Sequence, residues 1–166
     1  MLAALDGIAQ LLNRAVDRNL GDNFSLIPLL ILALGVGSIA GIIWVYIMSI
    51  ILHWMGGKLG GKATIKEVRV AITWSNVPVI WVLPLWIPAI LLFGDSLFTT
   101  DPFYSNINLL LISGIELVLS FWTFVISVHS LAEVNRLSTW KALLLAIIPS
   151  LGVLIMLLVY VIIINF

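Results

Sequence analysis

Residues 26–52 read LIPLLILALGVGSIAGIIWVYIMSIIL, an apolar stretch without a single charged side chain. A helix needs roughly 20 apolar residues to cross a hydrocarbon core of about 30 Å. Since backbone groups in lipid must be hydrogen-bonded within their own segment, this stretch is predicted to cross a membrane as an α-helix. Three more such stretches follow, and the sequence predicts an all-α polytopic transmembrane bundle with spans at about 26–52, 70–94, 107–128 and 142–166.

The composition of the whole chain supports a membrane protein. Of its 166 residues, 62% are hydrophobic and 10% are charged, whereas soluble domains have about 45–50% apolar and about 25% charged residues. A net charge of zero argues against a nucleic-acid-binding surface. Without cysteine, and with only the scattered His53 and His129, the sequence predicts no metal site and no cofactor.

Residues 1–24 form a separate amphipathic or linker segment before the transmembrane domain at 25–166. Apolar side chains recur there at helical spacing among polar neighbours, which predicts an amphipathic helix in the membrane interface. The alternative is a frayed terminus. The apolar residues are Leu5, Ile8, Leu11, Leu12 and Val16.

The second predicted span, 70–94, contains Pro78, Pro84 and Pro88. Proline lacks the N–H group that continues a helix, and its ring clashes with the preceding turn. We therefore expect a kinked or partly unwound segment that other helices cover.

Charge is distributed unevenly over the predicted loops. The loops at 56–69 and 129–141 are basic, while the loop at 95–105 carries Asp95 and Asp101 and no basic residue. The positive-inside rule assigns the two basic loops to the cytoplasm, where they are candidate contacts for lipids or partners. Thr64 and Glu67 have the spacing of a capping box at a helix start. The basic residues of the two loops are Lys58, Lys62, Lys66, Arg69, Arg136 and Lys141.

Glu116 is the strongest candidate for intramembrane chemistry, because a charged side chain at the centre of a span costs about 2.5–3.5 kcal/mol. One interpretation is a proton, ion or headgroup site; the other is polar packing between helices. We expect Asn76 to be its partner. The polar residues that share its helical face are Ser113, Ser120, Thr123 and Ser127, and those beside Asn76 are Thr73 and Ser75.

Two glycine patterns have alternative interpretations. Residues 56–63 nearly match a phosphate-binding loop, but Ala63 stands where Ser or Thr would bind Mg²⁺ and a span precedes the loop. A flexible turn is the favoured interpretation. Ala33, Gly37 and Gly41 form a small-residue stripe, which favours packing within the chain over homodimerisation.

Four stretches of the sequence have a recognisable pattern. They are the loop Gly56-Gly-Lys-Leu-Gly-Gly-Lys-Ala-Thr64, the opening Trp74-Ser-Asn-Val-Pro78 of the second span, Val128-His-Ser-Leu-Ala-Glu-Val134 and Ser138-Thr-Trp-Lys-Ala142. With this pattern the chain resembles the Yip family over roughly residues 26–166. This resemblance implies a membrane protein, usually with five spans and a cytoplasmic N-terminus. Only four spans are visible here, so we expect that a first span is missing. Eukaryotic relatives sit in ER and Golgi membranes and bind prenylated GTPases through an N-terminal cytosolic region. No such region is visible here, and the chain looks more like a prokaryotic member in the cell membrane.

The leading functional hypothesis is a non-enzymatic membrane scaffold or adaptor that organises partner membrane proteins or lipids through its basic loops. The alternative is transport of a small solute, ion or lipid, or a transporter subunit, centred on Glu116 and Asn76. An intramembrane enzyme is the weakest hypothesis, because His129 lies near Ser130 and Glu133 only in sequence. Homo-oligomerisation remains a further expectation.

Overall fold

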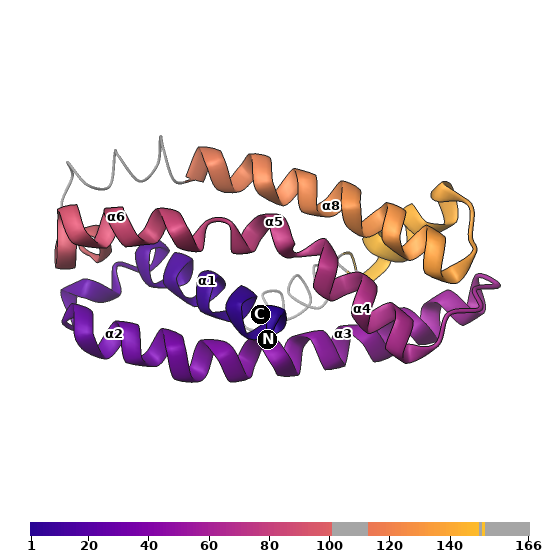
Figure 1. The fold of residues 1–166 in the computed structure, drawn as a ribbon, viewed down its shortest axis with the longest axis horizontal. Helices are drawn as coiled ribbons and strands as arrows, with labels where there is room; N and C mark the ends of the chain where they lie inside the picture. The colour runs from indigo at the N-terminus through magenta and orange to yellow at the C-terminus, as the bar shows by residue number, and fades with distance from the viewer. Residues whose placement is uncertain (101–112, 150, 152–166) are drawn as a thin grey trace, which may run out of the picture. The chain divides into compact units, whose positions relative to one another are not determined.

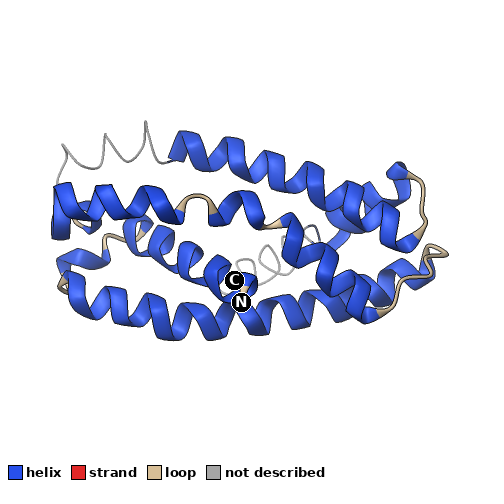
Figure 2. Cartoon of the chain, in the orientation of Figure 1, coloured by secondary structure: helices blue, strands red, loops and turns tan. Residues whose placement is uncertain are grey.

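The computed structural model describes residues 1–100, 113–149 and 151. All regular elements in these ranges are helices, joined by short loops (Figure 2), which confirms the predicted all-α class. Figure 1 labels most of them in chain order. The elements are α1 (Leu2–Asp17), η1 (Leu20–Asp22), α2 (Leu26–Leu32), η2 (Ala33–Gly37), α3 (Ser38–Lys58), α4 (Ile65–Ser75), α5 (Val77–Ile80), α6 (Leu83–Phe93), η3 (Gly94–Phe98) and α8 (Ser113–Asn135).

Within the part of the chain that the structure describes, three helical stretches are long and apolar enough to cross a membrane, namely Leu26–Lys58, Val77–Phe98 and Gly114–Asn135. Large apolar side chains along them are exposed on the protein surface, where lipid rather than water is the suitable solvent. The chain is therefore an integral membrane protein. A shorter apolar helix occupies Thr139–Pro149. The rest of the predicted fourth span, and residues 107–112 of the third, lie outside the described residues.

The predicted second span is broken where its prolines require it. α4 ends at Ser75, α5 covers four residues, and α6 begins at Leu83. The breaks lie at Asn76, two residues before Pro78, and at 81–82, just before Pro84. Pro88 remains inside α6. The break at Asn76 places a partly buried polar side chain within an otherwise apolar stretch.

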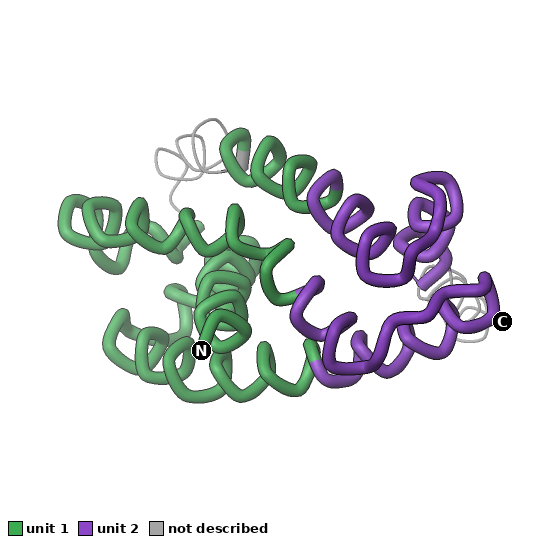
Figure 3. The backbone as a smooth tube through the Cα atoms, turned by 45° about the vertical axis from the view of Figure 1, so that its right-hand side comes forward, with its two compact units in different colours: residues 1–45, 73–124 green, residues 46–72, 125–166 purple. Residues whose placement is uncertain are grey.

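Contacts divide the chain into two compact units, coloured separately in Figure 3. Unit 1 comprises residues 1–45 and 73–124, and unit 2 comprises residues 46–72 and 125–166. In unit 1, α1 packs against η2 and α5. Its core combines residues of α1, α2, η2, α6 and η3, and the rings of Trp86 and Phe98 stack with centroids 5.8 Å apart. Residues 2–17 are therefore a packed helix of unit 1.

Small residues bring α1 close to the first spanning helix. A Cβ atom on Gly7 would overlap the carbonyl oxygen of Gly37 and lie 2.8 Å from the Cα atom of Gly41. A Cβ atom on Gly41 would likewise overlap the carbonyl oxygen of Ala3. The stripe predicted at Ala33, Gly37 and Gly41 thus packs within the chain, as expected, and α1 is its partner.

Two aspartates hold chain segments of unit 1 together. The Leu26 N–H donates to Asp95 Oδ1 at 2.6 Å, so a carboxylate from a distant segment caps the start of α2. The Thr100 N–H and hydroxyl donate to the carboxylate of Asp22 at 3.2 and 3.0 Å. Sequence analysis used Asp95 only to orient the chain and found no role for Asp22.

The helices continue further into the predicted basic loops than expected. α3 extends to Lys58, α4 begins at Ile65 and α8 extends to Asn135. The connections therefore shorten from 56–69 and 129–141 to 59–64 and 136–138. The last turns of α8 continue beyond the hydrophobic stretch because Leu131 and Asn135 are buried in unit 2 and hold these turns by packing.

Candidate functional site

A buried carboxylate lies at the centre of unit 1. Asp6 on α1 is 1% exposed. Its Oδ2 atom accepts a hydrogen bond from Asn76 Nδ2 at 3.0 Å, and both carboxylate oxygens accept from Gln10 Nε2 at 3.2 Å. α1 supplies Asp6 and Gln10 one turn apart, and the helix break before Pro78 supplies Asn76. The three side chains form a polar cluster inside an apolar unit.

Burial raises the pKa of Asp6 above its usual value, and the hydrogen bonds from Gln10 and Asn76 oppose this rise. α1 is not one of the three spanning helices. Sequence analysis missed Asp6 because it took residues 1–24 as an interfacial or linker segment. A signal was present, since Asp6 lies on the same helix face as Leu2 and Ala9, among apolar neighbours.

Apart from Asn76, none of the described residues predicted for the intramembrane site forms a hydrogen bond with the side chains of this cluster. Asn76 pairs with Asp6, not with Glu116 as the sequence suggested. Glu116 Oε1 is buried, with no hydrogen-bond partner among the residues that the structure describes. Ser75 is buried beside Asn76 at the end of α4, Ser113 begins α8, and Ser120 is exposed on α8. The polar face of α8 is thus only partly buried.

In unit 2, Asn135 organises the glycine-rich connection. Its side chain is 1% exposed and donates to the Leu131 carbonyl at 3.0 Å, while its backbone carbonyl accepts from the Lys62 N–H at 3.2 Å. Asn135 Oδ1 occupies the space that a Cβ atom would need on Gly56 or Gly61, at 2.8 and 2.6 Å. Glycine is required at both positions because a side chain would displace Asn135. Sequence analysis did not identify this residue.

The backbone of the glycine-rich connection is not arranged to hold a phosphate. A phosphate-binding loop presents several free N–H groups to its anion. Here the N–H groups of residues 59, 60, 61 and 62 all donate to carbonyl oxygens of the chain. Gly60 has φ +90°, a backbone conformation that glycine adopts without strain. The interpretation as a turn is therefore supported over nucleotide binding.

The predicted basic residues form a cationic surface on unit 2. Lys58, Lys62, Lys66, Arg136 and Lys141 are exposed. Lys58 Nζ lies 3.8 Å from the centroid of the Trp54 ring, and Lys141 Nζ donates to the Leu59 carbonyl at 3.2 Å. Arg69 is less exposed and stacks 3.9 Å above the ring of Tyr46. Unit 2 thus presents cations whose stems are fixed against aromatic and backbone groups.

Glu67 does not offset this surface as a free carboxylate. It completes the predicted capping box: its Oε2 atom accepts from the Thr64 N–H at 2.7 Å and from the Thr64 hydroxyl at 2.8 Å, and its own N–H donates to Thr64 Oγ1 at 3.3 Å. The hydrogen bond from the Thr64 backbone is the main cause that lowers the pKa of Glu67, and the charge of Arg136 adds to it. The capping box is therefore confirmed.

Comparison with known proteins gives one family. The family model described as the Yip1 domain matches residues 1–161. No curated protein and no solved structure matches the chain.

Proposed function

The chain belongs to the Yip1 domain family of membrane proteins, and from this premise we propose that it is a non-enzymatic scaffold or adaptor. It holds acidic segments of partner membrane proteins, or anionic lipids, against the basic surface of unit 2. The observation that carries the proposal is the charge of that unit. Six basic residues and two acidic ones belong to unit 2, whereas unit 1 has two basic residues and six acidic ones.

The backbone at Arg136 supports a role for its charge. Arg136 directly follows α8 and has φ 54°, the left-handed conformation in which glycine is favoured. A non-glycine residue there costs roughly 1–2 kcal/mol. A strained position that keeps an exposed cation is more readily explained by binding than by stability.

The fixed backbone of the glycine-rich connection at 59–64 supports the same function. The bonds of Asn135, Lys62 and Gly61 fix the path of the backbone, so the backbone that carries Lys62 needs no further ordering on binding. By the positive-inside rule this surface faces the cytoplasm, and we place the protein in a prokaryotic cell membrane. Electrostatic binding of this kind weakens as salt screens the charges.

The experiment is photo-crosslinking in native membranes. A photoreactive phenylalanine analogue replaces Trp140, which is 78% exposed in unit 2, and a control probe replaces Trp122, 58% exposed in unit 1. The proposal expects a defined adduct from the first position only. That adduct is lost when Lys58, Lys62 and Arg136 are changed to glutamine, and it persists in Glu116→Gln.

Transport is the second candidate, and the buried Asp6 cluster favours it. A carboxylate bonded across a helix break is a common arrangement for an ion or proton site in a membrane protein. Reconstituted vesicles with a pH-sensitive dye inside test this candidate. Proton or solute flux that is lost in Asp6→Asn and Glu116→Gln, and that survives the loop substitutions, would favour transport over the adaptor function.

A further inference from the structure

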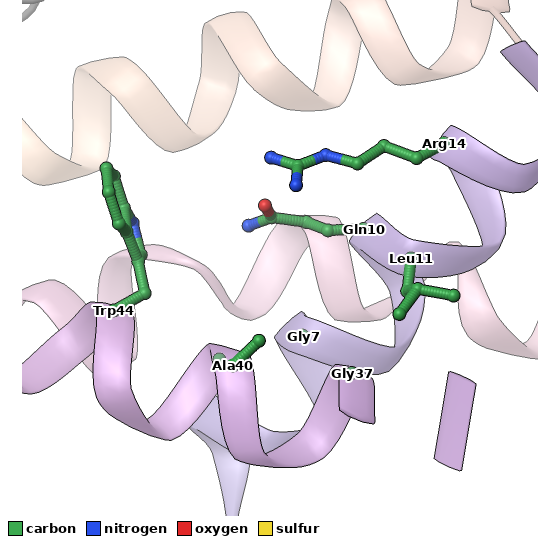
Figure 4. Close-up of a pocket in the computed structure, with 8 residues that line it drawn as sticks. Gly7, Gln10, Leu11, Arg14, Gly37, Ala40 and Trp44 are labelled. Atoms are coloured by element: carbon green, nitrogen blue, oxygen red, sulfur yellow. The ribbon is translucent and has the colours of Figure 1, made fainter. Parts of the chain in front are cut away.

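A groove of about 380 Å³ lies in unit 1 between α1 and the stretch from η2 into α3 (Figure 4). Its volume falls in the usual range of small-molecule sites, about 300–1,000 Å³. The groove shares Gln10 with the polar cluster at Asp6 and has no residue in common with the basic surface of unit 2. Six of the residues that line it are Gln10, Arg14, Gly37, Ala40, Gly41 and Trp44.

Among the described residues that line this groove, Arg14 is the only charged one, and its side chain is exposed. Its side chain and that of Gln10 extend from α1 into the same space as the Trp44 ring (Figure 4). Among the residues that the structure describes, no hydrogen bond or ion pair satisfies the guanidinium group. Gln10 donates its N–H groups to Asp6, so its amide oxygen remains to accept a bond from a ligand or water.

The two ends of the groove differ in chemistry. Gly7 lies against Gly37 and Gly41, while Leu12 and Ala15 share a core with Leu29 and Ala33, so α1 runs antiparallel to the first spanning helix. Arg14 is therefore nearer than Gly7 to the Leu26 end of that helix. Towards the other end, the groove is lined by the small residues of η2 and α3 and by Trp44.

We propose that this groove binds one membrane phospholipid, with the phosphodiester on Arg14 and part of an acyl chain along Ala40 and Trp44. A guanidinium group pairs with a phosphate through two parallel hydrogen bonds. Gly37 and Gly41 are in close contact with α1, so the acyl chain would lie beside them, against Ala40, whose small side chain leaves room next to the Trp44 ring. The neighbouring α3 side chains Ile39 and Ile43 are 61% and 52% exposed and face the hydrocarbon from which the lipid would come.

A soluble phosphate shares the chemistry recognised by Arg14, but it makes no use of Ala40 or Trp44. If the ligand is a lipid, its binding should therefore depend on Arg14 at one end of the groove and on Ala40 and Trp44 at the other. This site is independent of the basic surface of unit 2, because all its residues belong to unit 1. Its failure would leave the adaptor proposal untouched.

Native mass spectrometry of the full chain, released from detergent after addition of dioleoylphosphatidylglycerol, tests the proposal. Three variants are compared with the parent: Arg14→Gln, Ala40→Phe, which fills the groove, and Arg18→Gln, an exposed arginine of the same segment that does not line it. We expect one tightly held lipid on the parent and on Arg18→Gln. We expect about tenfold weaker retention in Arg14→Gln and in Ala40→Phe, at unchanged melting temperature.

Two further probes identify the ligand chemistry. Dioleoylglycerol, which has the chains but no phosphate, should not be retained, and millimolar inorganic phosphate should not displace the lipid. Equal retention by Arg14→Gln and the parent overturns the proposal, as does equal loss in Arg14→Gln and Arg18→Gln. Displacement by inorganic phosphate, or retention unaffected by Ala40→Phe, overturns it in favour of a simple anion site. If Arg14→Gln fails to fold, Ala40→Phe alone still decides the outcome.

Discussion

The side-chain amide of Asn76 donates a 3.0 Å hydrogen bond to the buried carboxylate of Asp6, 70 positions away in the chain. The bond joins α1 to the point where the second spanning segment breaks. A buried carboxylate needs such donors, because desolvation without compensating hydrogen bonds is costly. The Asp6–Asn76 pair therefore couples the position of α1 to the geometry of the break.

Replacing Asn76 by alanine should lower stability by about 1–3 kcal/mol, because it removes one of the two donors to Oδ2 of the buried Asp6 carboxylate. Thermal unfolding followed by tryptophan fluorescence measures the effect. In an Asp6→Leu background the same substitution should cost much less, since the partner is absent. Equal costs in both backgrounds would show that the bond contributes nothing.

The raised pKa of Asp6 gives a pH dependence with a defined sign. The folded chain binds this proton more tightly than the unfolded chain, so stability decreases as the pH rises above 3.8, the usual pKa of an aspartate, and levels off above the folded pKa. Asp6→Asn removes this dependence. The melting temperature of Asp6→Asn relative to the parent should therefore increase from pH 4 to pH 8; a constant difference would contradict the assignment.

The contact between α1 and the first span depends on Gly7. Gly7→Ala should destabilise the protein by several kcal/mol or prevent folding, because the new Cβ atom overlaps the Gly37 carbonyl oxygen. Gly35→Ala is the matched control, since nothing lies within 4 Å of its Cβ position. That control should be neutral or stabilise the helix by up to about 1 kcal/mol. Similar melting temperatures for the two variants would rule out the close approach.

The turn around Asn135 gives a second matched pair in unit 2. Gly61→Ala would place a Cβ atom 2.6 Å from Asn135 Oδ1 and 2.8 Å from the Gly56 carbonyl oxygen, whereas Gly57→Ala meets open space. We expect rapid tryptic cleavage after Lys62 in folded Gly61→Ala, because the connection loses its fixed path. Gly57→Ala should be cleaved as slowly as the parent.

Glu67 should make the start of α4 sensitive to acid. Its pKa is lowered in the folded chain, so its stabilising effect is complete above 4.5, the usual pKa of a glutamate, and is lost as the pH falls through the folded pKa. In Glu67→Gln, the melting temperature should be lower than that of the parent at pH 7, and the difference should shrink below pH 4. The same pH dependence of the melting temperature in both proteins would show that the charge of the Glu67 carboxylate adds no stability to the capping box.

Local features were predictable from the sequence because their causes are local. The capping box needs only Thr64 and Glu67 at the right spacing, and the helix breaks need only the prolines. Asp6 and Asn135 could not be assigned in this way, since what buries each of them comes from distant parts of the chain. The same reason explains why Asn76 was given the wrong partner: sequence spacing places it on a face but does not choose between Glu116 and Asp6.

The most direct test of the adaptor function compares photo-crosslinking from position 140 in two variants of opposite character. Arg136→Gly relieves the left-handed strain and should raise the melting temperature, yet it removes a cation of the basic surface. Glu116→Gln leaves that surface intact. The account predicts that Arg136→Gly, although more stable, loses most of its partner adduct, and that the adduct that remains is more sensitive to salt than that of the parent. Glu116→Gln should retain the adduct. Full capture by Arg136→Gly, with capture or flux lost in Glu116→Gln, would contradict the account.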